Sequence, residues 1–394
     1  MRTIVELDGR LHSAQQAALA LRLCHRLEIS DRHIRRLTAE VGADLIARRD
    51  RAVERRRRRQ LPPHVKAPPA VAVVEVDGGR VGMRQSGCGP GVHQPHYRED
   101  KVACLISMEG RTSEQDPQPE PPPSFIEPRR VRRLVQRIKA QATGEAPAEE
   151  EGEGEGEAGA RPGPEEPWRG APKPLQRTCV ASMACSRQFG PMVAAEAQGR
   201  DFYRAGRGAF VADGQAYNWT IWRGYFRHFE PIADFLHVLC YVYLAAQAAG
   251  GGAEEQWSRY LRWLRACWQG RVREVLDELA GLAAALGPVG EGEEVAESDP
   301  REVVRQAQVY LHNNAARMDY GRYRRQGLPV TSSLVESLVG EFHARVKGPQ
   351  KYWNDPEGAE RILQVRAAVL SEDDRLGRYF AERPGNPYRR RKAG

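Results

Sequence analysis

Three carboxylates stand where they could hold divalent cations. Asp77 follows the apolar run AVAVVEV, Asp213 follows the run GAFVA, and Glu336 lies within TSSLVESLVGEFHARVKG. Neighbouring strands of one sheet bring their carboxyl ends together, so Asp77 and Asp213 could be neighbours, and a helix packed across the sheet could add Glu336. Three such groups cannot all stay ionised without cations. Two Mg²⁺ or Mn²⁺ ions about 4 Å apart are the usual solution, and such a pair promotes phosphoryl transfer.

Each acid also has a simpler interpretation. Asp77 in DGG and Asp213 in DG could be ordinary turn residues, because Asp-Gly is a common turn dipeptide. The stretch SLVE is a capping box, with Ser333 as N-cap and Glu336 returning to its amide. Spacing alone favours this capping role for Glu336.

The helix that carries Glu336 is predicted to have two distinct faces. One face is apolar and is formed by Val335, Val339, Phe342 and Val346. The other has Glu336, Gly340, His343 and Lys347 at helical spacing. On this face Glu336 could bind a metal ion, Gly340 leaves space, and His343 and Lys347 could contact the phosphates of a substrate. This role is compatible with capping.

Several segments must position these acids. Continuous apolar runs predict strands at 70–79, 79–85 and 101–108, with the first ending at Asp77-Gly78-Gly79. A helix over 188–205 leads into the strand that ends at Asp213. Further helices are predicted at 254–285, 301–318 and 331–348. Near the N-terminus, Ser30 or Asp31 can cap a helix over 32–45, which gives residues 1–60 the proportions of a helix-turn-helix pair.

The distribution of arginine favours nucleic acid as a partner. The formal net charge is +8, and only seven of the 60 basic residues are lysines. Guanidinium groups bind phosphate bidentately, although a GC-rich genome also favours arginine codons. The run RRDRAVERRRRRQLPP is interpreted either as a solvated linker or, preferably, as a basic arm that contacts phosphates. The candidate DNA contacts are Arg32, Arg35, Arg36, Arg322, Arg324, Arg325, His343, Arg345, Lys347 and Lys351.

Five collinear stretches resemble insertion-sequence DDE transposases of the ISKra type. They are VEVDGGRV, HYREDKVACLISM, FVADGQAYNWTIWRGYFRHFEPIADFLH, LHNNAARMDYGRYRRQGLPVTSSLVESLVGEFHARVKG and WNDPEGAERILQVRAAVLSEDDRL. The resemblance covers about residues 70–388 apart from an acidic insertion. It implies catalytic and metal-binding roles for Asp77, Asp213 and Glu336, and an Asp-x-x-His signature at Asp234 and His237.

The resemblance also implies an organisation and a setting. We expect an α/β fold with an RNase H-like mixed sheet, an all-helical insertion before the last catalytic helix, and DNA ends and target DNA as partners of a homo-oligomer. The expected segments are a helical DNA-binding region at 1–60, core at 70–141 and 176–245, a disordered acidic linker at 142–175, a helical insertion at 250–330, and the catalytic helix with a basic end at 331–394. Seven cysteines without a Cys-x-x-Cys pair favour a reducing cytoplasm. The resemblance implies that this is the bacterial cytoplasm, with the protein at the nucleoid.

Two alternatives remain open. A restriction-like nuclease would use Asp77 with the Glu-x-Lys pair Glu99 and Lys101, and would not need Asp213 or Glu336. A catalytically idle transposase relic would bind DNA without cutting it. The nuclease leaves most of the chain unexplained, and the presence of all three acids argues against the relic.

Overall fold

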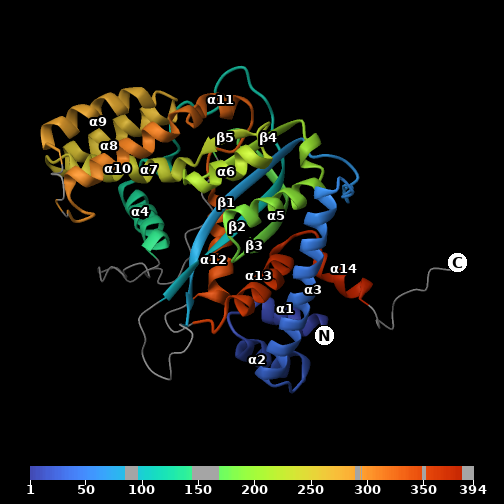
Figure 1. The fold of residues 1–394 in the computed structure, drawn as a ribbon. Helices are drawn as coiled ribbons and strands as arrows, with labels where there is room; N and C mark the ends of the chain where they lie inside the picture. Colours follow the sequence, from blue (N-terminus) through green and yellow to red (C-terminus); the bar gives the residue numbers. More distant parts are fainter. Residues whose placement is uncertain (85–95, 144–167, 289–292, 294, 348–351, 384–394) are drawn as a thin grey trace.

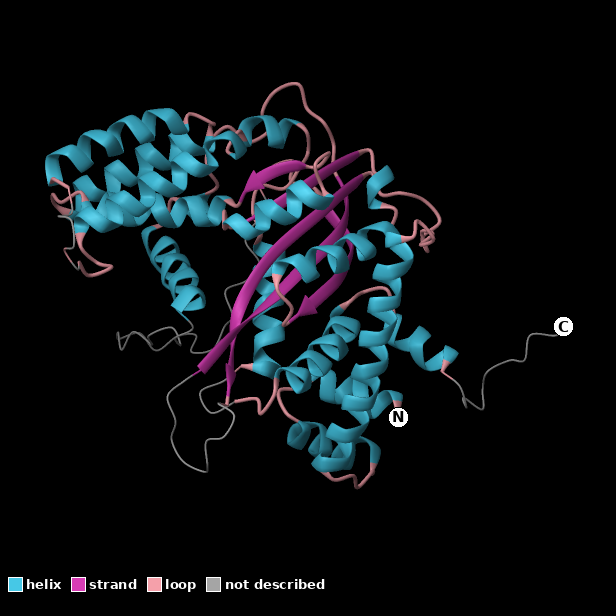
Figure 2. Ribbon diagram, viewed as in Figure 1, coloured by secondary structure: helices cyan, strands magenta, loops and turns pink. Residues whose placement is uncertain are grey.

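A five-stranded mixed sheet forms the centre of the molecule (Figures 1 and 2). The computed structural model describes residues 1–84, 96–143, 168–288, 293, 295–347 and 352–383. The strands are β1 (Val71–Met83), β2 (His96–Glu109), β3 (Lys173–Ser182), β4 (Arg207–Ala212) and β5 (Glu230–Ala233), in the order β3-β2-β1-β4-β5. The first three strands pair antiparallel, β4 runs parallel to β1, and β5 runs parallel to β4. The predicted α/β class is confirmed.

Strand β1 continues through the segment where the sequence predicted its end. Gly79 lies opposite Asp100 and Met83 opposite His96, so antiparallel pairing with β2 extends the strand through Asp77-Gly78-Gly79. The two strands predicted at 70–79 and 79–85 are therefore one. Parallel pairing with β4, in contrast, stops at Val76. Asp77 is therefore the first residue of β1 beyond the end of β4.

Alternate residues of β1 pack into two different cores, one on each face of the sheet, because successive side chains of a strand point to opposite sides. Val73 belongs to the larger core and Val74 to the smaller. The larger core is covered by α7 (Phe235–Ala248), α12 (Ser333–Val346) and α13 (Pro356–Leu370). The smaller core is covered by α5 (Ser186–Gly199) and α6 (Ala216–Tyr225).

A helical lobe stands at one end of the sheet, at the upper left of Figure 1. It contains α8 (Ala253–Trp268), α9 (Val272–Leu286) and α10 (Pro300–Asn314), which pack with α7, while α11 (Tyr320–Arg325) leads back to the core. The helix predicted over 254–285 is two helices, because the chain turns at Gly270 with a φ of +79°. Between residues 250 and 330 the described part of the chain contains no strand, as expected for a helical insertion.

The N-terminal helices are docked on the core. They are α1 (Arg2–Arg10), α2 (Ala14–His25) and α3 (Asp31–Arg57). The Ser30 hydroxyl accepts a hydrogen bond from the amide of His33, which confirms one of the two predicted caps. Helix α3 packs along α13 so closely that a Cβ on Gly42 would lie 2.5 Å from the Arg361 carbonyl oxygen.

The length of α3 corrects two expectations. The helix spans 27 residues, far beyond the predicted 32–45, and therefore does not have the proportions of a small helix-turn-helix pair. It also includes most of the arginine run, which forms its last turns and is not an extended basic arm. Helix α1 and strands β3 and β5 were not predicted. Strand β5 has only four residues, and the first half of β3 is partly exposed, so neither has a continuous apolar run.

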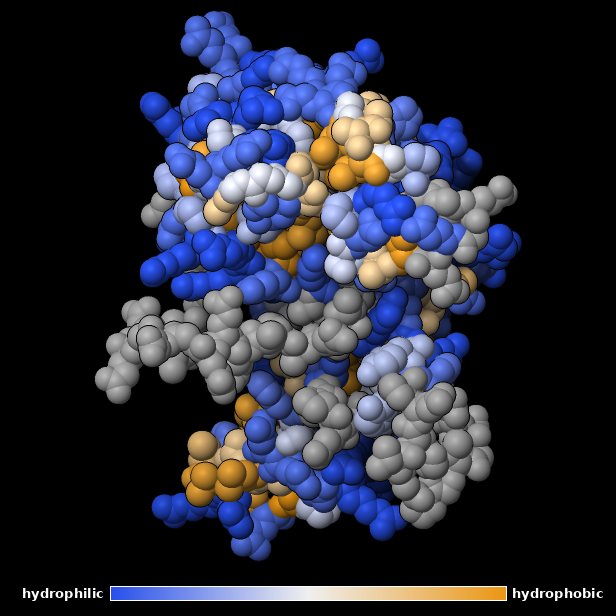
Figure 3. All heavy atoms as spheres, turned by 90° about the vertical axis from the view of Figure 1, so that its left-hand side faces the viewer, coloured by the Kyte–Doolittle hydropathy of each residue, from blue (hydrophilic) through white to orange (hydrophobic). Residues whose placement is uncertain are grey.

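Two further helices complete the described chain: α4 (Pro128–Thr143) and α14 (Arg375–Glu382). Most of the predicted acidic linker, 144–167, lies outside the described residues, and β3 begins within its last part. The face in Figure 3 is mainly hydrophilic over the helical lobe. Leu19 and Leu23 of α2 are exposed, and so is Leu27, which follows the helix. No helix in the described ranges has the length and apolar character needed to cross a membrane.

Candidate functional site

Asp77 and Asp213 lie beside each other at the edge where β4 ends. The last aligned pair of the parallel ladder is Val76 with Ala212, and the two acids are the next residue of each strand. Val76 points into the smaller core, so alternation within β1 directs Asp77 to the opposite face, where His237 of α7 and His343 of α12 act on it. Asp213 follows the end of β4, and its charge also acts on Asp77. The sequence prediction that these acids are neighbours is confirmed.

The Asp213 carboxylate is fixed by its own turn. Its Oδ1 accepts hydrogen bonds from the Gln215 amide at 3.0 Å and from Nδ2 of Asn218 at 2.8 Å. Gly214 has a φ of +98°, and a Cβ there would lie 2.6 Å from the Tyr310 ring of the helical lobe. The Asp-Gly pair is therefore a turn, as one interpretation required, and the turn also holds the carboxylate in a defined position.

Asp77 carries an elevated pKa. Burial is the largest cause and the negative charge of Asp213 the second, and together they raise the pKa of Asp77 to about 6. The charges of His237 and His343 and the hydrogen bond from the Gly78 amide, at 2.7 Å, act in the opposite direction. Like charges held close at a partly buried position are typical of sites that bind cations.

The Asp-x-x-His signature connects three elements at this edge. Asp234 follows β5 and is fully buried, and its Oδ2 accepts hydrogen bonds from the amide of His237 and from Nδ1 of the same residue, the latter at 2.6 Å. Its Oδ1 accepts the amide of Ser332 at 2.7 Å, immediately before α12. Asp234 therefore orients the His237 ring next to Asp77 and anchors the start of the helix that carries Glu336.

Helix α12 packs on β1, and the helix and the strand run in the same direction. The Glu75 carboxylate accepts the amide of Val335 at 2.9 Å, and the His343 ring occupies the space above Gly79. Asp77 lies between Glu75 and Gly79 in β1, so the first turns of α12, which include Glu336, cross the strand beside it. The N-cap is Ser332 and Ser333 is already helical, so the predicted capping box is wrong. The side chain of Glu336 lies outside the described residues.

His343 faces the sheet and not a DNA path. Its Nε2 lies 3.3 Å from Oδ1 of Asp100, which is fully buried opposite Gly79. A Cβ on Gly79 would be 2.0 Å from the His343 ring, so this position excludes larger residues. Lys347, one turn further, is half-buried, and burial lowers its pKa. The phosphate path predicted along this face of α12 is therefore wrong at His343, which is occupied within the protein.

The donor set of the two acids suits a hard cation. In the described part of the chain, Oδ2 of Asp77 and Oδ2 of Asp213 accept no hydrogen bond, which leaves each acid one oxygen available. Carboxylate oxygens are the ligands that Mg²⁺ and Mn²⁺ prefer. Among the described side chains, no three His, Cys, Asp or Glu residues are grouped to hold a metal, and this set excludes Glu336.

The residues of the nuclease alternative do not converge. Glu99 and Lys101 pair with each other at 2.6 Å, and Lys101 packs over the Tyr217 ring of α6. Val102 lies opposite Asp77 in the antiparallel ladder and shares its face, so alternation turns Glu99 and Lys101 to the opposite face of the sheet. The three groups of that nuclease are thus separated by the sheet itself.

Besides His343, two further predicted DNA contacts are wrong. The Arg324 side chain is fully buried, forms two hydrogen bonds to the Asp116 carboxylate and stacks 4.0 Å from the centre of the Trp268 ring. Arg345 is nearly buried, and it pairs with Asp8 of α1 at 3.1 Å. Both arginines hold elements together, and Arg324 has no exposed surface that a phosphate could reach.

The other predicted contacts differ in exposure. Arg32, Arg35 and Arg36 are exposed on α3, although Arg35 also pairs with Asp31 at 2.6 Å. Arg322 is partly exposed and pairs with Glu230 at 2.7 Å, and Arg325 is half-buried. Lys351 lies outside the described residues.

Three residues of the site were missed by the sequence analysis: Glu75, Asp100 and Asn218. Glu75 could have been found, because it is an acid two positions before Asp77 in an otherwise apolar strand and so shares its face. Asp100 contacts His343, which is distant in sequence, and Asn218 bonds the carboxylate of the Asp213 turn. No sequence pattern marks either residue.

Compared with known proteins, the chain matches no protein family and no curated protein.

Proposed function

We propose that the chain is a DNA transposase of the ISKra type, with an RNase H-like core that cleaves and rejoins phosphodiester bonds. The observation that carries the proposal is the neighbouring pair Asp77 and Asp213, with Asp77 on the face covered by the helix that carries Glu336. The mixed sheet with helices on both faces is compatible with such a core. The helical lobe precedes α12 in the chain, where the resemblance expects an insertion.

The chain's own residues orient and hold this site. Asp77 and Asp213 would bind one divalent cation, and Asp77 and Glu336 a second. Such ions, when bound, activate an attacking hydroxyl and stabilise the leaving oxygen in phosphoryl transfer. Asp234 fixes His237 next to Asp77, and Glu75 holds the first turn of α12 against the sheet. The partner would be duplex DNA in the bacterial cytoplasm.

The test is nicking of a supercoiled plasmid that carries the DNA flanking the reading frame, with Mg²⁺ or Mn²⁺ and with EDTA as the blank. We expect Asp77→Asn, Asp213→Asn and Glu336→Gln each to lower the nicking rate at least about 10³-fold, as loss of one member of a catalytic unit does. Binding of the same DNA should persist, because these variants remove negative charge.

Glu99→Gln is the matched control, since it neutralises a nearby carboxylate on the other face of the sheet. Cutting by Asp77→Asn at the wild-type rate would overturn the proposal. Loss of nicking in Glu99→Gln with normal nicking in Glu336→Gln would select the nuclease. DNA binding without any cutting by the wild-type chain would select the relic.

A further inference from the structure

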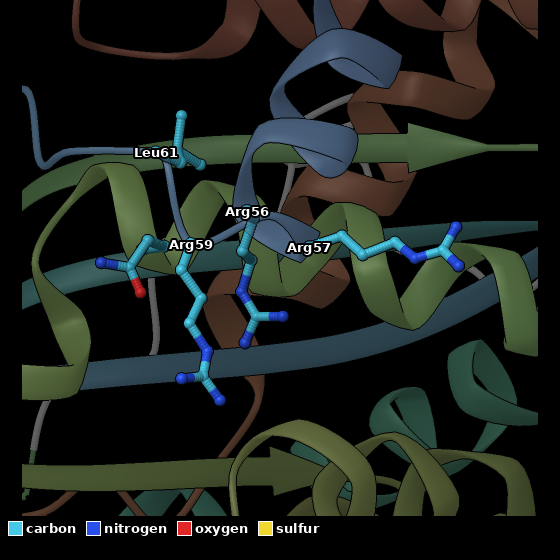
Figure 4. Close-up of a pocket in the computed structure, with 5 residues that line it drawn as sticks. Arg56, Arg57, Arg59 and Leu61 are labelled. Atoms are coloured by element: carbon cyan, nitrogen blue, oxygen red, sulfur yellow. The ribbon is translucent and has the colours of Figure 1, made fainter.

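A basic pocket lies at the C-terminal end of α3, on the other side of the sheet from the acid pair. It has a volume of about 400 Å³ and is lined by Arg56, Arg57, Arg59, Leu61 and Gln198. Figure 4 shows the three arginine side chains extending from the end of α3, with Arg56 and Arg59 pointing the same way. Gln198 belongs to the last turn of α5, which covers the smaller core.

The lining combines three positive charges with no carboxylate. The nearest acid of α3 is Glu54, which pairs with Arg58 at 2.7 Å and only at 3.9 Å with Arg57. The Arg57 side chain is 83% exposed. Arg59 forms no ion pair with any described residue. The pocket therefore keeps a net positive charge that the described residues around it do not neutralise.

One guanidinium of the pocket is preorganised. Arg56 lies 5.5 Å from the centre of the Tyr203 ring and 5.6 Å from that of Tyr225, and it donates a hydrogen bond to the Tyr203 hydroxyl at 3.3 Å. A stacked guanidinium loses less freedom when it binds a phosphate, and its planar fork matches two phosphate oxygens.

The backbone at Arg59 gives a second, independent indication. Helix α3 ends with the amide of Gln60 bonded to the Arg55 carbonyl at 2.7 Å and the amide of Arg59 bonded to the Arg56 carbonyl at 2.9 Å. This termination places Arg59 in the left-handed region, with a φ of +58°, where glycine is the favoured residue. Basic residues at a helix C-terminus stabilise the helix dipole. That effect accounts for the charges but not for an arginine in the glycine position.

We propose that this pocket binds a backbone phosphate of duplex DNA, at a segment distant from the scissile bond. The assignment of DNA as the source of the phosphate rests on the proposed function. Gln198 lies in the last turn of α5, a few residues before the start of β4, whereas Asp213 follows the end of β4. Six residues of strand, about 20 Å at roughly 3.3 Å per residue, separate the two ends. The pocket and the acids also lie on opposite faces of the sheet. A single duplex could contact both only if it passed around the edge of the sheet.

The experiment measures the affinity of the full chain for a fluorescent duplex of random sequence over a series of salt concentrations. The main variant is Arg59→Gly, which fits the left-handed backbone and so should fold with unchanged or higher thermal stability. We expect the slope of log affinity against log salt to fall by about 1, as for loss of one phosphate contact. Arg273→Gln, an equal loss of charge at an exposed position of α9, should leave the slope unchanged.

A second arm measures the binding of pyrophosphate by calorimetry. A lowered duplex slope in Arg59→Gly supports the proposal, and an unchanged slope overturns it. Loss of pyrophosphate binding with an unchanged duplex slope would assign the pocket to a small free phosphate and overturn the DNA assignment. The nicking result with Asp77→Asn is independent, so the catalytic assignment and the pocket can fail separately.

Discussion

Two sets of buried carboxylates in this molecule differ in whether a basic residue neutralises their charge. Glu196 and Asp373 meet Arg375, whose guanidinium lies 2.6 Å from the first and 2.9 Å from the second. Burial alone would raise the pKa of Asp373, but the charges and hydrogen bonds of Arg375 and Arg378 outweigh it and lower that pKa to about 2. Every charge in this cluster is matched.

The acid pair at the end of β4 has no such counterion. No Lys or Arg forms an ion pair with Asp77 or Asp213 in the described chain, and the pKa of Asp77 is raised to about 6. An unmatched pair of this kind lowers the stability of the fold, so its presence requires a reason other than stability. Burial with matched charge holds the chain together, whereas burial with unmatched charge indicates a ligand of opposite sign.

The largest predicted effect is on the matched cluster. Replacing Arg375 by Met leaves Glu196 and Asp373 buried without their cation, and breaking a buried pair in this way costs about 3–5 kcal/mol of the free energy of unfolding. Urea denaturation at neutral pH measures it. The control is Arg262→Met, which breaks the exposed pair with Glu278 and should cost less than about 1 kcal/mol. Equal losses of unfolding free energy in the two variants would show that burial of the Arg375 cluster adds nothing to the strength of its ion pairs.

The second prediction concerns the unmatched pair and has the opposite sign. The pKa of Asp77 is raised in the folded state, so the folded chain binds the proton more tightly than the unfolded chain, whose value is near 3.8. Stability therefore falls as pH rises from about 4 to about 6, and above pH 6 the ionised carboxylate costs about 3 kcal/mol. In metal-free buffer Asp77→Asn should raise the melting temperature above pH 6, and the gain should vanish toward pH 4.

Asp373→Asn is the comparison for that experiment. Its lowered pKa means that the ionised carboxylate contributes stability above pH 3.8, which is lost only as pH falls through about 2. The Asn variant should therefore be less stable than the wild-type chain at neutral pH, by about 2 kcal/mol. Melting curves that shift in the same direction for both variants would contradict the argument.

Local patterns in the sequence were sufficient for much of this site. The apolar runs predict strands next to Asp77 and Asp213, and the spacing of Val335, Val339 and Phe342 predicts the buried stripe of α12. Ser30 is one of the two caps that the sequence offers for α3. These features depend on residues within a few positions of one another, where periodicity and capping chemistry dominate.

Contacts between distant segments could not be derived in this way. Arg324 looks like a surface cation until Asp116, 208 residues away, is placed beside it. Arg345 likewise depends on Asp8 at the other end of the chain. The continuation of β1 past Asp77 depends on the length of its partner β2, which a pattern within β1 does not contain. Burial of a charge is a property of the assembled fold.

The smallest predicted change in stability tests how β1 holds the helix that carries Glu336. Glu75 accepts the Val335 amide in the first turn of α12, a capping contact worth about 1 kcal/mol. Glu75→Leu should lose about that stability, and nicking should fall by more than this loss explains, because the turn that carries Glu336 is no longer held on β1. Glu75→Gln keeps an acceptor and should restore most of the nicking rate. A Leu variant that nicks normally despite its lower melting temperature would show that Glu75 supports the fold without positioning the third acid.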